Sequence, residues 1–443
     1  MLEEFIRFKT LFASPENRTI ESLKKIYDDS EEMKKIIAEL ISPFLNEEVI
    51  GDKNILLKPN WVLHDRKDDD NICLRTNDAI IISILSFILQ YKPRAVVIGD
   101  APIQGCNWDA MISNRLSVNV NAMANEFNIP ITIKDFRRTT FSPELNNPSI
   151  DRSPLSEYLI FDLGKNSHLE SITSGKNEFR VTSYNPDRLI ESHSQGIHKY
   201  CITKELFSAD VIISLPKVKT HQKTGITCAL KNLVGINGDK DYLPHHRIGG
   251  TGFGGDCYPG KNVLRLMSEY LLDEANRRQG KWSYKIFSLT SAIVWKLTKP
   301  SKLHHLSAAW HGNDTTWRMV LDLNKIALYG RSDGTISSDK QRVLFSFCDG
   351  IIAGQGDGPL KPEPHALGVI SFTNNSHLND YCMAILMGFE PENIPLLNSF
   401  SRLYNDDNYE IILDSYKVGV RQLKNISLKT LPAPGWVDHL IKC

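Results

Sequence analysis

Short apolar runs alternate with longer amphipathic stretches along most of this chain. Runs with the length of buried strands occupy 54–57, 95–98, 130–133, 211–215, 343–347 and 367–372. Between the first two runs, Thr76-Asn77-Asp78 is an N-cap signal and predicts a helix over 79–90. Because strand, helix and strand at this spacing are typical of a βαβ unit, we predict an α/β fold with a mostly parallel sheet flanked by helices.

Changes in this pattern predict four regions. Residues 1–50 are expected to form an N-terminal helical segment. Residues 51–260 are expected to form the α/β core, with an irregular insertion at 136–200. Within this insertion, alternation at 178–190 predicts antiparallel strands. Residues 261–330 predict a helical subdomain, and 331–443 a C-terminal α/β part that completes the core. The individual helices are predicted at 261–279, 283–298, 313–328 and 377–388.

Composition narrows the class of protein. The 443 residues suggest two or three packed lobes, and Lys+Arg equals Asp+Glu at 52 each. This balance disfavours binding to nucleic acid or to an anionic surface by the chain as a whole, so any basic site must be local. The eight cysteines form no Cys-x-x-Cys pair, so no iron–sulfur cluster is expected. No apolar stretch has the length of a membrane span, and we expect a cytosolic protein.

Polar clusters directly follow several predicted strands. Lys58 and Asn60 follow the first, Asp100 the second, Lys217 to His221 follow 211–215, and Asp349 follows 343–347. In open parallel sheets, ligands bind outside the carboxyl ends of the strands. These side chains are therefore expected to meet at one edge of the sheet.

The stretch 210–235 contains the highest concentration of candidate functional side chains. After the strand and Pro216 come basic residues, and a helix-like segment from about Gln222 follows. Its lysines can neutralise a phosphate or carboxylate, and the helix dipole would assist. We predict catalytic roles for Lys217, Lys219 and His221. His221 is expected to transfer a proton, with metal ligation or a turn position as alternatives. The predicted substrate-binding residues are Lys58, Asn60, Thr224, Lys231 and Asn232.

Further candidates lie outside this stretch. His245, His246 and Arg247 precede a glycine-rich segment that is interpreted as a lid or as a surface loop, and substrate binding is predicted for them. Residues 255–262 approach the pattern GxxxxGK[ST]. Asn262 replaces the required hydroxyl, so a nucleotide loop is not expected. Asp100, Asp349 and Asp357 could bind a hard divalent cation or carry protons, although Asp-Gly pairs also simply form turns.

The sequence Leu215-Pro216-Lys217-x-Lys219-Thr220-His221, with Thr224-Gly225 and Ala229-Leu230-Lys231-Asn232-Leu233-x-Gly235 after it, resembles the signature of the family called domain of unknown function 362. Lys58-Pro59-Asn60, Gly99-Asp100-Ala101 and the stretch from Asp349 to Pro359 resemble further parts of its pattern, in the same order. Many members carry ferredoxin modules, for which this chain lacks the cysteine spacing. The resemblance supports the choice of site residues and implies no reaction.

Three functional hypotheses follow. The first is an enzyme, with or without a divalent metal, acting on an anionic small molecule, phosphorylated or carboxylated, or on a sugar conjugate. The second is a non-catalytic binding or cofactor-assembly protein that uses the same pocket, and the third is a redox protein. Gly-x-Ser-x-Gly and His-Glu-x-x-His motifs do not occur, which disfavours common serine hydrolases and zincins. The sequence does not specify the cofactor or the oligomeric state.

Overall fold

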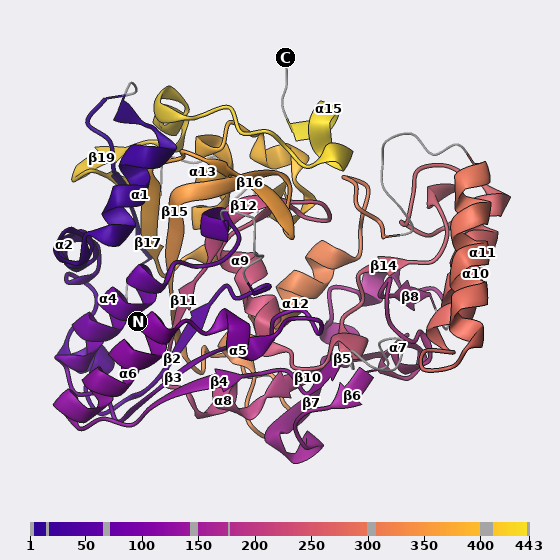
Figure 1. The fold of residues 1–443 in the computed structure, drawn as a ribbon, viewed down its shortest axis with the longest axis horizontal. Coiled ribbons are helices and arrows are strands. Elements are labelled where there is room, and N and C mark those ends of the chain that lie inside the picture. Colours follow the sequence, from indigo (N-terminus) through magenta and orange to yellow (C-terminus); the bar gives the residue numbers. More distant parts are fainter. Residues whose placement is uncertain are drawn as a thin grey trace.

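A large mixed sheet forms the centre of the fold in the computed structural model (Figure 1), which describes residues 4–14, 17–64, 71–141, 149–175, 178–298, 307–398 and 411–440. Nine strands follow one another in the order β19-β18-β1-β17-β15-β11-β2-β3-β4, and β12, β13 and β16 (Lys361–His365) branch from this path. The bounds along the path are β19 Tyr416–Val418, β18 Ile411–Leu413, β1 Ile6–Thr10, β17 Val369–Thr373, β15 Val343–Asp357, β11 Val211–Leu215, β2 Asn54–Pro59, β3 Ala95–Asp100 and β4 Ile131–Asp135. The strands β15, β11, β2, β3 and β4 pair in parallel, as the βαβ pattern predicts.

Alternate residues of the central strands enter two different cores. Ile55 and Leu57 pack into one apolar cluster, whereas Leu56 packs into the other. The same alternation runs through β11, where Ile213 and Ile212 enter opposite clusters. Because successive side chains of a strand point to opposite faces, a sheet covered on both sides requires such continuous apolar runs.

Helices cover both faces. The cluster containing Ile55 is completed by α1 (Ile20–Asp28), α2 (Ser30–Ile41), α4 (Asp78–Leu89) and α6 (Asn114–Phe127). The cluster containing Leu56 is completed by α9 (Ala229–Asn232), α12 (Thr316–Tyr329) and α13 (Ser376–Leu386). The shorter helices are α3 Glu47–Ile50, α5 Trp108–Met111, α7 Asp187–Ser192, α8 Lys204–Ser208, α14 Pro395–Asn398 and α15 Val437–Leu440. No helix in the described part of the chain combines the length and apolar character needed to span a bilayer.

Smaller sheets and a helical hairpin lie beside the main sheet. The small strands are β5 Thr139–Phe141, β6 Ser149–Asp151, β7 Tyr158–Asp162, β8 Phe179–Arg180, β9 His193–Ser194, β10 Ile197–Thr203 and β14 His246–Arg247. Two long helices, α10 (Val263–Asn276) and α11 (Ser283–Leu297), pack against each other at the edge of the molecule opposite α1 and α2 (Figure 1). The glycine-rich segment between β14 and α10 carries backbone hydrogen bonds such as Cys257 N to Gly249 O.

Three local predictions were wrong. Residues 6–10 form strand β1 within the segment expected to be helical. Residues 178–190, expected to be strands, contain only β8 before α7 begins. The segment after Pro216 forms an antiparallel hairpin, β12 (Lys217–His221) and β13 (Gly225–Thr227), instead of a helix from Gln222.

The hairpin has a simple physical cause. Val218 and Ile226 are fully buried on it, and Gly225 adopts a φ of +78° that closes the turn. The helix that follows, α9, has only four residues, so the predicted helix dipole at Gln222 does not exist.

Candidate functional site

A cavity of about 330 Å³ lies where β2, β3 and the β12–β13 hairpin end. This volume lies at the lower end of the range of small-molecule sites. Its lining contains the predicted residues Asn60, Asp100, Lys219, His221, Lys231, Asn232 and His245. It also contains residues that the sequence analysis missed, notably Trp61, Tyr184, Lys223, Thr227 and Lys240. Three of the four polar clusters expected to converge, those at Asn60, Asp100 and Lys219–His221, therefore meet in this lining, whereas Asp349 does not reach it.

Lys58 and Asp100, two of the predicted site residues, form an ion pair beside the cavity. Lys58 Nζ lies 2.7 Å from Asp100 Oδ1, and both side chains are buried. Asp100 also accepts hydrogen bonds from the backbone N–H groups of Trp61 and Ala101. Gly235 lies against this pair, and a Cβ atom there would be 1.7 Å from Asp100 Oδ1. The conformation thus requires glycine at the end of the motif because nothing larger fits.

A second pair lies outside the cavity lining. Lys217 Nζ is 3.0 Å from Asp349 Oδ2, and both side chains are fully buried. The Tyr27 hydroxyl donates to Asp349 Oδ1 at 2.5 Å and accepts from Lys217 Nζ at 3.0 Å. Asp357 accepts from Gln222 and likewise does not line the cavity. Asp100, Asp349 and Asp357 are thus engaged separately, and they do not form a group that could share one metal ion.

Four lysines of the cavity have no carboxylate partner among the described residues. Lys219, Lys223 and Lys240 donate to the backbone carbonyls of Leu74, Ser307 and Ala101. Lys231 has neither a hydrogen bond nor an ion pair with any described residue. Burial lowers the pKa of Lys219 and Lys231 to about 7, and that of Lys223 and Lys240 to about 8. The site thus holds cationic groups without their counterions.

Two histidines of the cavity differ in tautomer. His221 Nδ1 accepts from the backbone N–H groups of Lys223 and Thr224, at 3.0 and 3.2 Å. Nε2 of a neutral His221 ring therefore carries the proton. His245 Nδ1 lies 2.7 Å from the carbonyl oxygen of Leu243 and must donate, so its Nε2 is an acceptor. Burial, assisted by the neighbouring lysines, lowers both pKa values well below 6.5, so both rings are neutral at pH 7.

Polar atoms without partners also face this region. Asn60 Oδ1, Trp61 Nε1 and Thr227 Oγ1 are buried and form no hydrogen bond with the described residues. Buried polar atoms are almost always satisfied, and each exception needs an explanation. All three residues lie in the lining of this one cavity.

The remaining candidates lie around the cavity. Thr224 is buried and donates its hydroxyl to the carbonyl of Ile226, so it shapes the hairpin turn. Arg247 faces the carboxylates of Asp256 and Asp314, each at 3.9 Å. His246 lies beside Cys257 and Glu269. Thr224, His246 and Arg247 do not line the cavity. His246 and Arg247 form β14, which begins directly after His245.

The comparisons with known proteins cover this same region. The sequence profile of a family described as "Domain of unknown function (DUF362)" matches residues 162–384, just over half of the chain. The chain belongs to this family. The matched range contains the whole β11–β13 motif, α9 and the lysines from Lys217 to Lys240, whereas Lys58 and Asp100 precede it.

Individual relatives are distant. The thylakoid-associated protein sll1697 of Synechocystis sp. is 21% identical over 226 residues, which cover 51% of this chain. The alignment covers only 46% of that protein, so this DUF362 chain matches less than half of its length. Among solved structures, that of a Thermotoga maritima protein (Northeast Structural Genomics Consortium target VR152) has 7% identity and a TM-score of 0.32. The match covers 80% of this chain and 57% of the Thermotoga chain.

Proposed function

We propose that this protein is an enzyme that binds an anionic small molecule, phosphorylated or carboxylated, in the lysine-lined cavity. The observation that carries the proposal is the set of four lysines around one cavity that have no carboxylate partner among the described residues; Lys219 is fully buried, and the other three are partly buried. A buried cation without a counterion is costly, and an anionic ligand removes that cost. Lys219 and Lys231 would neutralise the anion, and His221 Nε2–H would donate to one of its oxygens.

In this proposal His245, the second histidine of the cavity, acts as the base. His245 Nε2 can accept a proton from the bound molecule, because its Nδ1 proton is held by Leu243. Burial, and to a smaller extent the nearby charges of Lys223 and Lys231, lower the pKa of His245. An anion that offsets those charges would raise this pKa and make His245 a stronger base.

The rest of the cavity indicates the character of the molecule. Apolar side chains, including Val62, Ile103, Val181 and Leu360, line the same volume as the lysines. Trp61 Nε1 and Asn60 Oδ1 offer one donor and one acceptor for polar substituents. These features favour a molecule with one anionic group and a larger, partly polar body, and a sugar phosphate or sugar acid fits this description.

The test is a thermal-shift screen with sulfate, inorganic phosphate, sugar phosphates and dicarboxylates. We expect at least one class to stabilise the wild type and to stabilise Lys231→Gln much less. Lys361→Gln, a change of an exposed lysine, is the matched control. Equal stabilisation of all three proteins by every compound would contradict the proposed site.

Catalysis is tested separately. Incubation with the stabilising compound, followed by mass spectrometry, should reveal a product that His245→Ala fails to form while still binding the compound. Binding without turnover in the wild type would instead identify a non-catalytic binding protein and would overturn the enzymatic part of the proposal.

A further inference from the structure

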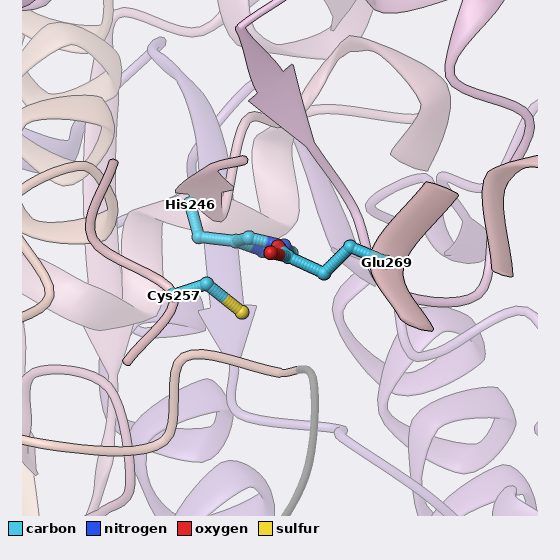
Figure 2. Close-up of side chains that lie close together, drawn as sticks. All are labelled: His246, Cys257 and Glu269. Atoms are coloured by element: carbon cyan, nitrogen blue, oxygen red, sulfur yellow. The ribbon is translucent and has the colours of Figure 1, made fainter. Parts of the chain in front are cut away.

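Three side chains from separate segments converge outside the cavity. Figure 2 shows His246 of β14, Cys257 of the glycine-rich segment and Glu269 of α10 pointing toward one another. One ligand atom from each lies within 4.8 Å of the other two, and His246 Nε2 is 3.9 Å from Glu269 Oε1. All three residues are buried, at 2–4% exposure.

Two of these groups have buried atoms without partners. His246 Nδ1 and Glu269 Oε1 form no hydrogen bond with any described residue, whereas the other carboxylate oxygen accepts from Gly249 N–H at 2.9 Å. A buried carboxylate oxygen and a buried imidazole nitrogen that form no hydrogen bond are costly in an apolar setting. Their meeting with a thiol in one small volume calls for a ligand that takes lone pairs from all three.

We propose that His246, Cys257 and Glu269 bind a zinc ion. Imidazole, thiolate and carboxylate are all zinc ligands, whereas a thiolate disfavours the hard ions Mg²⁺ and Ca²⁺. At bond lengths of about 2.0–2.3 Å, two ligand atoms of a tetrahedral zinc ion lie roughly 3.3–3.7 Å apart. His246 Nε2 and Glu269 Oε1 are 3.9 Å apart and all three ligand atoms lie within 4.8 Å of one another, so small side-chain movements would close the site around the ion.

Charge and position support the same conclusion. A thiolate and a carboxylate together balance the double charge of the ion, so the buried site is neutral as a whole. The three ligands leave one tetrahedral position for water or another donor. The ion would join β14 and the glycine-rich segment to α10. It would thereby fix His245, which precedes His246 and lines the cavity.

Zinc retention tests this site. The wild type, stripped with a chelator and reloaded with zinc, should retain about one ion per chain after desalting. Cys257→Ser and Glu269→Gln should retain at least about tenfold less at the same free zinc concentration. Cys106→Ser, a change of another buried cysteine, is the matched control and should behave as the wild type.

Two further readouts separate ligand loss from misfolding. Cobalt should give the wild type and Cys106→Ser a thiolate charge-transfer band that Cys257→Ser lacks, and circular dichroism should show all variants folded. Zinc should raise the melting temperature of the wild type but not that of Glu269→Gln. A wild type that retains no zinc, or a Cys257→Ser variant that retains as much as the wild type, would overturn the proposal. Neither result depends on the anion site.

A different observation concerns the outer face of the α10–α11 hairpin. On α11 and at its N-terminus, Trp282, Ile286, Leu289, Ile293 and Leu297 are all at least half exposed. Their spacing of three or four residues places them on one face. Met267 and Tyr270 of α10 are also about half exposed, and the two helices pack together at the edge of the molecule (Figure 1). Such a continuous exposed apolar face marks an interaction surface.

Charge decides between partners for this face. The lysines Lys261, Lys281, Lys285 and Lys296 are exposed between 261 and 298, whereas Glu269 and Asp273 are buried. The partly exposed Glu274 forms ion pairs with Arg277 and Arg278. A second copy of the chain would bring the same lysines toward its own. An anionic lipid surface complements them, and aromatic and aliphatic residues flanked by lysine are typical of helices that lie in a membrane interface. We infer that this hairpin docks on anionic membranes.

Vesicle flotation tests this inference. The wild type should float with vesicles containing phosphatidylglycerol and much less with pure phosphatidylcholine. Leu289→Ser/Ile293→Ser should bind at least about tenfold more weakly, because two aliphatic side chains that would enter the membrane interface are lost. Val118→Ser, at an exposed valine elsewhere, is the control. A wild type that stays with neither kind of vesicle would overturn the inference. So would a wild-type dimer that the double variant abolishes, because it would assign the face to self-association.

Discussion

His221 and His245 line one cavity with opposite hydrogen-bonding character. His221 presents a donor because two backbone N–H groups occupy its Nδ1, and His245 presents an acceptor because its Nδ1 proton is bound to Leu243 O. A molecule bound in this cavity would therefore meet a fixed donor and a fixed acceptor. We propose, in place of the predicted proton transfer, that His221 donates a hydrogen bond to an anion.

The donor role of His221 predicts different effects for two substitutions. His221→Gln keeps an N–H group near the position of Nε2 and should bind the anion within about threefold of the wild type. His221→Leu removes a hydrogen bond to a charged group and should bind about tenfold to a hundredfold more weakly. Isothermal titration with the stabilising anion measures both. Wild-type affinity in His221→Leu would remove His221 from the site.

Anion affinity should fall as pH rises. Lys219 and Lys231 have a pKa of about 7 in the ligand-free protein, so they lose their charge above neutrality, and an anion binds the protonated form. Sulfate is a suitable probe because its charge is constant over this range. Its affinity should be at least about tenfold weaker at about pH 9 than at about pH 6. Lys231→Gln should bind weakly at both values and show a shallower slope. A pH-independent affinity of the wild type would contradict the lysine assignment.

The same lysines should make the ligand-free protein more stable as pH rises. The pKa of Lys219 is about 7 in the folded state and near 10.5 when unfolded, so between these values the unfolded chain binds more protons. Lys219→Met should therefore stabilise the protein most near pH 6. We expect that gain to shrink by at least about 1 kcal/mol near pH 10, as measured by urea unfolding. A pH-independent difference between the two proteins would show that Lys219 titrates normally.

Lys217 and Asp349 show which part of the site the sequence could predict. Apolar periodicity predicted the strands and the polar residues that follow each of them. It therefore also predicted that Lys58, Asp100, Lys217 and Asp349 lie at one sheet edge. Which lysine pairs with which aspartate depends on register, because Lys217 lies opposite Asp349 in the β12–β15 pairing. Lys223 and Lys240 carry no local signal that distinguishes them from surface lysines, and only the tertiary fold directs them into the cavity.

The Lys217–Asp349 pair is expected to support the fold. Asp349→Asn leaves Lys217 buried without a counter-charge and should cost about 3–5 kcal/mol in urea unfolding. Lys217→Met in the same chain should recover part of this loss. Asp357→Asn, at a less buried aspartate outside the pair, should cost less than about 1 kcal/mol. A fully stable Asp349→Asn variant that no longer binds the anion would instead assign Asp349 to the site.

Gly235, at the end of the motif, lies in close contact with the Lys58–Asp100 pair. A methyl group at this position would lie 1.7 Å from Asp100 Oδ1 and 2.7 Å from Lys58 Nζ, so the buried pair or the backbone must move. We expect Gly235→Ala to lose more than about 3 kcal/mol of unfolding free energy, the cost of breaking a buried ion pair. Gly419→Ala is the matched control, because its φ of −77° suits alanine and its Cβ would meet nothing within 4 Å. That control should change stability by less than about 1 kcal/mol, in the stabilising direction. Equal stability of the two variants would mean that the Lys58–Asp100 pair tolerates displacement and that Gly235 is not required for its geometry.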